Sequence, residues 1–185
     1  MSRLRVAPVT LGEARAFVER HHSHHHAPVG GLFAVGVAEG DRLCCVAVVS
    51  RPVARVLDAQ GNVAEITRVA SDHTRHAASK CIAAATRMAL AGGYTRLVSY
   101  TLLGESGASY LAAGWHVTGL VAASDRWHTR EARTTVQGGA KVRWETGHDA
   151  LPADGAAALV CAFAVGVVDV PARPETLPLL AMVTP

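Results

Sequence analysis

Short, mostly apolar runs separated by turn residues occupy much of the first part of the chain, and such runs are typical of strands. The predicted strands here are residues 3–10, 32–37, 43–49 and 63–70. The second and third would pair as an antiparallel hairpin, because the turn residues Glu39–Asp41 lie between them. After the first strand, Thr10 and Glu13 have the S/T-x-x-E spacing of a capping box, which predicts a helix that runs to about His22.

The hydrophobic period changes to about 3.6 residues between His76 and Ala91, which predicts a helix ended by Gly92-Gly93. Residues 97–102 then form a strand that follows a helix that follows a strand, so we expect a βαβ unit with a parallel strand pair. A helix over 106–113 and strands at 115–121 and 141–145 complete a mixed α/β pattern. The predicted buried stripe of the long helix is Ala77, Cys81, Ala84, Ala85 and Met88.

The last part of the chain does not continue this pattern. Residues 1–147 are predicted to form one domain, and residues 148–185 an Ala- and Pro-rich extension without a recognisable motif. Residues 159–168 would pack either against a sheet edge or against a second subunit of a homodimer. The longest apolar stretch, residues 155–168, is shorter than the roughly 20 residues needed to cross a bilayer, so no membrane partner is expected.

Composition narrows the function classes only a little. The 18 basic and 15 acidic residues leave a net charge of +3, and the basic residues are scattered rather than clustered as in most nucleic-acid binders. The four cysteines have neither a C-x-x-C spacing nor the Cys/His spacing of a zinc module, and no secretory signal is recognisable. We therefore expect a cytoplasmic protein with reduced thiols.

Two segments resemble a known family. Residues 64–82 and the later Tyr-Leu-Ala-Ala-Gly-Trp at 110–115 are similar to the central strand, phosphate loop and second helix of the GNAT superfamily of N-acetyltransferases. The resemblance implies a GNAT-like α/β fold, a mostly antiparallel sheet with a central splayed parallel strand pair flanked by helices. It also implies that acetyl-CoA or another acyl-CoA is the coenzyme and that an acyl group passes to an amine-bearing acceptor in a ternary complex.

The family's phosphate loop, Q/R-x-x-G-x-G/A, corresponds to residues 74–79. Backbone amides at a helix N-terminus suit a diphosphate, because they offer unpaired N–H groups in a positive field. Thr74 replaces the Q/R, and both family glycines are absent, so an ordinary alanine-rich helix with a polar start is the alternative. An amide near Val69 or Ala70 would meet the oxyanion. The predicted coenzyme-binding residues are Val69, Ala70, Thr74, Arg75, His76, Ala77, Ala78, Ser79 and Lys80.

The resemblance also implies two catalytic residues. Tyr110 matches the family tyrosine that protonates the departing thiolate, and a phenol is a reasonable donor for that step. The alternative is a core tyrosine with its hydroxyl at the rim. Glu65 resembles the glutamate that accepts a proton from the amine in some members, directly or through water. The alternative for Glu65 is an exposed strand residue paired with Arg68 or with a neighbouring strand.

Basic and aromatic residues suggest where an acceptor would bind. Arg51, Arg68 and Trp127 are the candidate substrate contacts, and this composition also occurs in solvated loops. The chain further resembles small GNAT-like proteins of phages and mobile elements, including the Mom type that modifies DNA, so a nucleic-acid base is an alternative acceptor. A non-catalytic binding protein on a GNAT scaffold is a third hypothesis, because a fold does not guarantee activity.

Five histidines lie within residues 21–26. Imidazoles at this density suit a transition metal, while the end of a helix also favours partly protonated histidine through its dipole. Contact with the acceptor is a third reading. None of the three is singled out by the sequence, and no metal ligand is assigned.

Overall fold

The computed structural model describes residues 3–21, 28, 30–122 and 139–146, and every structural statement below refers to these. Seven strands form one sheet with the order β1-β2-β3-β4-β5-β7-β6. The strands are β1 (Leu4–Pro8), β2 (Phe33–Glu39), β3 (Arg42–Ser50), β4 (Val63–Ser71), β5 (Arg96–Leu102), β6 (His116–Val121) and β7 (Lys141–Glu145). The helices are α1 (Leu11–His21), α2 (Arg55–Asp58), α3 (Ala77–Ala91) and α4 (Ala108–Ala112).

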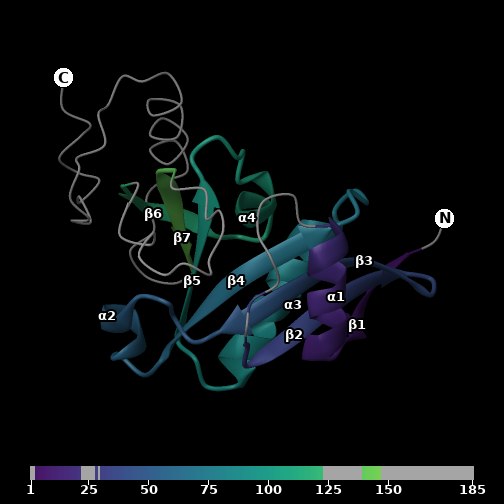
Figure 1. Cartoon of the computed structure of the whole chain (residues 1–185), viewed down its shortest axis with the longest axis horizontal. Helices are drawn as coiled ribbons and strands as arrows, with labels where there is room; N and C mark the ends of the chain where they lie inside the picture. Colours follow the sequence, from purple (N-terminus) through teal and green to yellow (C-terminus); the bar gives the residue numbers. More distant parts are fainter. Residues whose placement is uncertain (1–2, 22–27, 29, 123–138, 147–185) are drawn as a thin grey trace, which may run out of the picture.

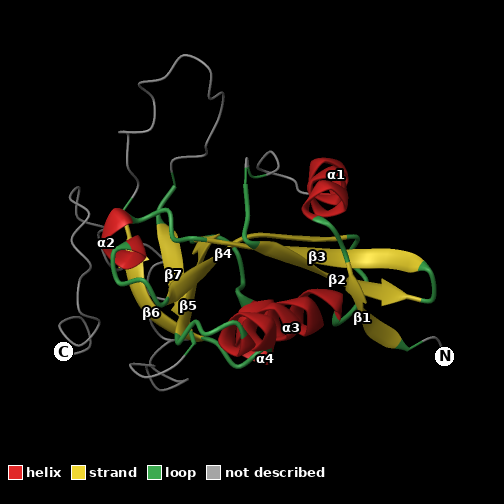
Figure 2. Cartoon of the chain, turned by 90° about the horizontal axis from the view of Figure 1, so that it is seen from below, coloured by secondary structure: helices red, strands yellow, loops and turns green. Residues whose placement is uncertain are grey.

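Helices cover both faces of the sheet. Figure 2 shows α1 on one face and α3 with α4 on the other. The larger core lies under α3 and α4 and contains the buried Trp115 and Trp144, whereas α1 packs Phe17 and Val18 over β3 and β4. In the described part of the chain, no helix is long and apolar enough to span a bilayer.

Local sequence signals account for several elements. The capping box is confirmed, because the Thr10 N–H donates to Glu13 Oε2 at 2.7 Å and the Glu13 N–H donates to Thr10 Oγ1 at 3.2 Å. The predicted hairpin is confirmed as β2 and β3, with Gly40 in the left-handed region (φ 59°) at its turn. The buried Trp115 follows Gly114, where the chain leaves α4 with φ 81°.

Two predictions about helices are wrong. Met88 of α3 is 48% exposed, and Ala89 is buried in its place. The row of side chains that faces the sheet steps by four residues from Cys81 to Ala85 to Ala89, which turns Met88 about 100° away from it. Helix α4 is shorter than the predicted helix over 106–113, and the structure has a further short helix, α2, that was not predicted.

The parallel pair predicted by the βαβ pattern is confirmed, and its two strands diverge. Strands β4 and β5 pair only from Val63↔Arg96 to Ile66↔Ser99, after which they separate (Figure 1). Strand β4 has a bulge at this point. Ile66 and Arg68 pair with consecutive residues of β3, so Thr67 between them is the extra residue of the bulge. A bulge bends its strand and increases the twist. The sheet therefore has a fork, formed by the divergence of β4 and β5 beyond Ile66 and Ser99.

Candidate active site

A cavity of about 400 Å³ lies where the β4–α3 loop and the start of α3 approach α4. The loop and the two helices contribute small or polar side chains here, so backbone atoms are accessible from the cavity. The lining residues are Ser71, His73, Thr74, His76, Ala78, Ser79, Ala108, Ser109 and Ala112. The cavity therefore lies on the face of the sheet that carries α3 and α4, at the end of β4 that does not pair with β5.

The first turn of α3 lines one side of this cavity. His76 is the N-cap and has a left-handed backbone (φ 64°), and no side chain caps the helix. The Ala77 and Lys80 amides donate to Thr74 O and His76 O, whereas the Ala78 and Ser79 amides have no hydrogen-bond acceptor among the described residues. Unpaired amides at the positive end of a helix favour an anion.

The predicted coenzyme-binding residues divide into two groups. Thr74, His76, Ala78 and Ser79 line the cavity, and so does His73, which the sequence reading did not include. Arg75, Ala77 and Lys80 are not among the lining residues: Ala77 is fully buried, and the Lys80 ammonium donates to Leu4 O of β1 at 2.6 Å. Val69 and Ala70 lie on β4 beyond the bulge, where β4 has no pairing with β5.

Tyr110 of α4 lies in the core beneath the cavity. It is 8% exposed, its ring is stacked on Trp144 at 5.6 Å between centroids, and it meets Trp115 edge-on. Its hydroxyl lies 2.6 Å from Ser99 Oγ, which in turn donates to Ile66 O at 2.8 Å. Burial raises the pKa of Tyr110, so the phenol is protonated at neutral pH. The hydroxyl is therefore buried at the apex of the fork, not at a solvent-exposed rim.

Glu65 lies on the opposite face of the sheet, because side chains alternate along β4 and the neighbouring Ile66 belongs to the α3 side. Its Oε2 accepts a hydrogen bond of 2.9 Å from the Val53 N–H. At 5% exposure it is not an exposed strand residue, so that alternative is wrong. Burial raises the pKa of Glu65, against the Val53 hydrogen bond and the charges of Lys141 and Arg68, which lower it.

The candidate acceptor contacts are only partly assembled. Arg68 is half-buried next to Glu65, and burial lowers its pKa while the Glu65 charge raises it. Arg51 forms two hydrogen bonds of 2.8 Å with the Asp58 carboxylate of α2, and its side chain is otherwise exposed. Trp127 lies outside the described residues.

Sequence reasoning missed a group of charged residues on the same face as Glu65. Tyr100 pairs with Arg143 across β5 and β7, and Arg143 forms an ion pair with Glu145. The Nε atoms of Arg96 and Arg143 are buried without a hydrogen-bond partner among the described residues. The period of two along residues 141–145 indicated one shared face for Lys141 and Arg143, but nothing in the sequence indicated that this strand lies next to β5.

Of the five histidines within residues 21–26, only His21 is among the described residues. His21 ends α1, where its ring lies 4.3 Å from that of Phe17, and His22–His26 lie outside the described residues. Within the described ranges, no group of three or more His, Cys, Asp or Glu side chains has the geometry to hold a metal ion.

Comparison with solved structures identifies the fold. The chain is similar to a Bacillus subtilis acetyltransferase solved with CoA, at 14% identity and a TM-score of 0.54, over 80% of this chain and 99% of that one. It is also similar to the ribosomal-protein-S18-alanine N-acetyltransferase of Escherichia coli, at 10% identity and a TM-score of 0.54, over 81% and 99%. A third similar structure is a polyamine N-acetyltransferase from Drosophila melanogaster, at 9% identity and a TM-score of 0.54, over 79% of this chain and 100% of that one. The fold is therefore that of the GNAT acetyltransferases, as predicted.

A match to a protein-family model assigns the chain more specifically than the similarity of fold does. The model of the Mom protein family matches residues 3–150, which include every strand and helix described above. The chain belongs to the Mom protein family, in agreement with the resemblance noted from the sequence. No curated protein matches the chain.

Proposed function

We propose that this protein is an acyl-CoA-dependent N-acyltransferase that passes an acyl group, most simply acetyl, directly to an amine of the acceptor. The observation that carries the proposal is the cavity at the unpaired end of β4, which Ala78 and Ser79 line and where their amides have no hydrogen-bond acceptor among the described residues. The GNAT fold supports it, and so does the CoA bound in the Bacillus subtilis acetyltransferase.

The residues present fit the diphosphate of such a coenzyme. Ala78, Ser79 and Ala108 leave the backbone accessible, and no carboxylate is among the residues that line the cavity. The Ala78 and Ser79 amides would hold one phosphate, with the Thr74 hydroxyl and the His76 ring beside them. Beyond the bulge, the edge of β4 toward β5 is unpaired, so N–H groups near Val69 and Ala70 would hold the pantetheine arm and the thioester oxygen.

The two proton transfers of the reaction would take place on opposite faces of the sheet, next to the fork. An acyl thioester supplies the activated carbonyl, and the nitrogen of the acceptor attacks it from the side of Glu65. Glu65 accepts the proton that this nitrogen loses, directly or through water, and Tyr110 donates its proton to the sulfur that departs. The raised pKa makes Glu65 a stronger base, and Tyr110 carries its proton at neutral pH.

A nucleic-acid base is the acceptor that specific observations favour. The chain belongs to the Mom protein family, and the surroundings of Glu65 are cationic, with Arg68 and Lys141 both close enough to lower its pKa. Tyr100 and Arg143 extend the same face. An exocyclic amino group is a weak nucleophile at neutral pH and must lose a proton as it attacks, which a buried carboxylate would assist. Arg51 and Trp127 remain predicted contacts for the extruded base and its phosphates.

Two measurements test the proposal in order. Acetyl-CoA at about a hundred times its Kd is expected to raise the free energy of unfolding by about 2.7 kcal/mol, which a thermal melt detects. Cells that express the protein are then expected to contain DNA or RNA nucleosides with an added acyl mass, absent from cells that express Tyr110→Phe. Coenzyme binding without transfer to nucleosides, peptides or polyamines would favour a non-catalytic binding protein, and no binding of any acyl-CoA would exclude the proposal.

A further inference from the structure

The loop between β4 and α3 holds its shape without the glycines that such a shape favours. His73 and His76 have φ values of 69° and 64°, in the left-handed region that side chains with a Cβ rarely adopt. His73 and His76 line the cavity together with Ala78 and Ser79 of the first turn of α3, so their backbone conformation determines how the chain enters this helix beside the cavity. Contacts from outside the loop must therefore offset the unfavourable backbone conformation.

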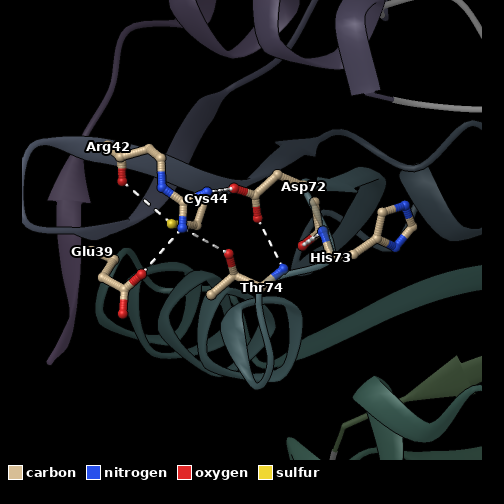
Figure 3. Close-up of polar contacts among 7 residues, drawn as sticks. Glu39, Arg42, Cys44, Asp72, His73 and Thr74 are labelled. Atoms are coloured by element: carbon tan, nitrogen blue, oxygen red, sulfur yellow. Dashed lines mark hydrogen bonds and ion pairs between the residues drawn. The ribbon is translucent and has the colours of Figure 1, made fainter. Parts of the chain in front are cut away.

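Among the residues of β3, Arg42 supplies the side-chain contacts to this loop. Figure 3 shows the Arg42 guanidinium between the Asp72 carboxylate, with which it forms an ion pair, and the Thr74 side chain. Arg42 Nη2 donates to Thr74 Oγ1 at 3.2 Å and to Glu39 Oε2, the latter at 3.1 Å. Arg42 thus contacts both residues that flank His73 in the chain.

Asp72 joins the guanidinium to the backbone of the loop. Its Oδ1 accepts a hydrogen bond of 2.9 Å from the Thr74 N–H, and its own N–H donates to Cys44 O of β3 at 2.9 Å. Burial acts to raise the pKa of Asp72, but the Thr74 hydrogen bonds and the charges of Arg42 and His21 outweigh it and lower the pKa. The carboxylate is therefore ionised at neutral pH, as the ion pair requires.

We propose that Arg42 is a positioning residue for the coenzyme: it fixes the residue 72–76 loop through Asp72 and Thr74, so that the Ala78 and Ser79 amides are already aimed at an anion. The inference rests on the proposed function. Arg42 is not among the residues that line the cavity, so it acts through the loop and not by touching the phosphate. A side chain from the neighbouring strand thus supports a loop in which two histidines, His73 and His76, have left-handed backbones.

The test compares Arg42→Gln with Arg5→Gln, since Arg5 also forms an exposed ion pair at the β2–β3 turn, with Asp41 at 3.7 Å, but contacts no part of the loop. Calorimetric titration with CoA is expected to give a Kd raised about tenfold in Arg42→Gln and unchanged in Arg5→Gln. Asp72→Asn is expected to weaken CoA binding similarly, and the double variant no further, because the two side chains act as one unit.

Hydrogen exchange of the free variants supplies the second readout. Faster exchange confined to the amides of residues 72–79 is expected for Arg42→Gln, whereas a merely structural loss would speed exchange across the sheet as well. A CoA Kd within twofold of wild type, additive effects in the double variant, or exchange raised throughout β2 and β3 would overturn the inference. If wild type itself bound no CoA, the proposed function would fail, and the exchange map would still decide whether Arg42 orders the loop.

Discussion

Gly107, the N-cap of α4, makes the sharpest test of how the site is built. Its backbone is left-handed (φ 61°), and a Cβ placed there would overlap Cζ2 of Trp144 and lie 2.5 Å from Cη2. The indole ring has little freedom to move. It is 1% exposed, its Nε1–H donates to Thr101 Oγ1 at 2.9 Å, and its ring is stacked on Tyr110.

Two penalties add for Gly107→Ala. The left-handed backbone costs about 1–2 kcal/mol for a residue with a Cβ, and overpacking against a fixed ring costs about 1–3 kcal/mol. Gly114→Ala is the matched control, because Gly114 lies at the other end of α4 with φ 81° and nothing within 4 Å of its Cβ position. We therefore expect Gly114→Ala to lose about 1–2 kcal/mol and Gly107→Ala about 2–5 kcal/mol.

Urea unfolding followed by far-UV circular dichroism measures both losses, and thermal melts check them at roughly 2–4 °C per kcal/mol for a chain of this size. Because Ala108, Ser109 and Ala112 of α4 line the cavity, a displaced α4 is also expected to weaken acetyl-CoA binding in Gly107→Ala alone. Equal losses of stability in the two variants would refute the reasoning, since the backbone penalty would then account for everything and Trp144 for nothing.

Three further outcomes follow from the site. Tyr110→Phe is expected to lower the rate of acyl transfer at least tenfold with an unchanged Kd for acetyl-CoA, because only the bond to Ser99 is lost; a raised Kd with an unchanged rate would contradict an acid role. Burial raises the pKa of Glu65 above 4.5, so wild type is expected to lose stability relative to Glu65→Gln as the pH rises from 4.5 through the folded pKa, in urea titrations at several pH values. The pKa of Asp72 is lowered below its ordinary value of 3.8. The stability advantage of wild type over Asp72→Asn is therefore expected to be fully present at pH values above 3.8 and to vanish as the pH falls through the folded pKa.

Elements whose signals are local could be predicted from the sequence. The capping box of Thr10 and Glu13, the Gly40 turn and Gly114 each determine a few neighbouring dihedral angles, and each was found where expected. The bulge at Thr67 could not be predicted in this way. It depends on which residues of β3 face Ile66 and Arg68, and the pairing register of two strands is not written in either one alone.

In the candidate site, too, local features could be predicted from the sequence, whereas contacts between distant residues could not. Period two placed Glu65 on one face of β4, but whether that face is buried depends on the chain after β3, which brings the Val53 N–H to the carboxylate. Likewise, the resemblance pointed to residues 74–79, while the residue that contacts Thr74 is Arg42, 32 positions earlier. Contacts between residues so far apart in sequence follow from the sheet order, which only the assembled fold supplies.

The fork connects the two halves of the proposed chemistry through one residue pair. Ile66 and Ser99 are the last partners of β4 and β5, and the hydrogen bonds from Tyr110 through Ser99 end on Ile66 O. Glu65 precedes Ile66, so its side chain leaves the same strand on the other face. The proposed proton acceptor on one face and the proposed proton donor on the other therefore connect to neighbouring residues of β4, and the bulge at Thr67 comes directly after them, where the fork opens. For this reason an insertion or deletion at Thr67 is expected to abolish transfer more completely than the loss of either Glu65 or Tyr110, which a comparison of the three transfer rates would show.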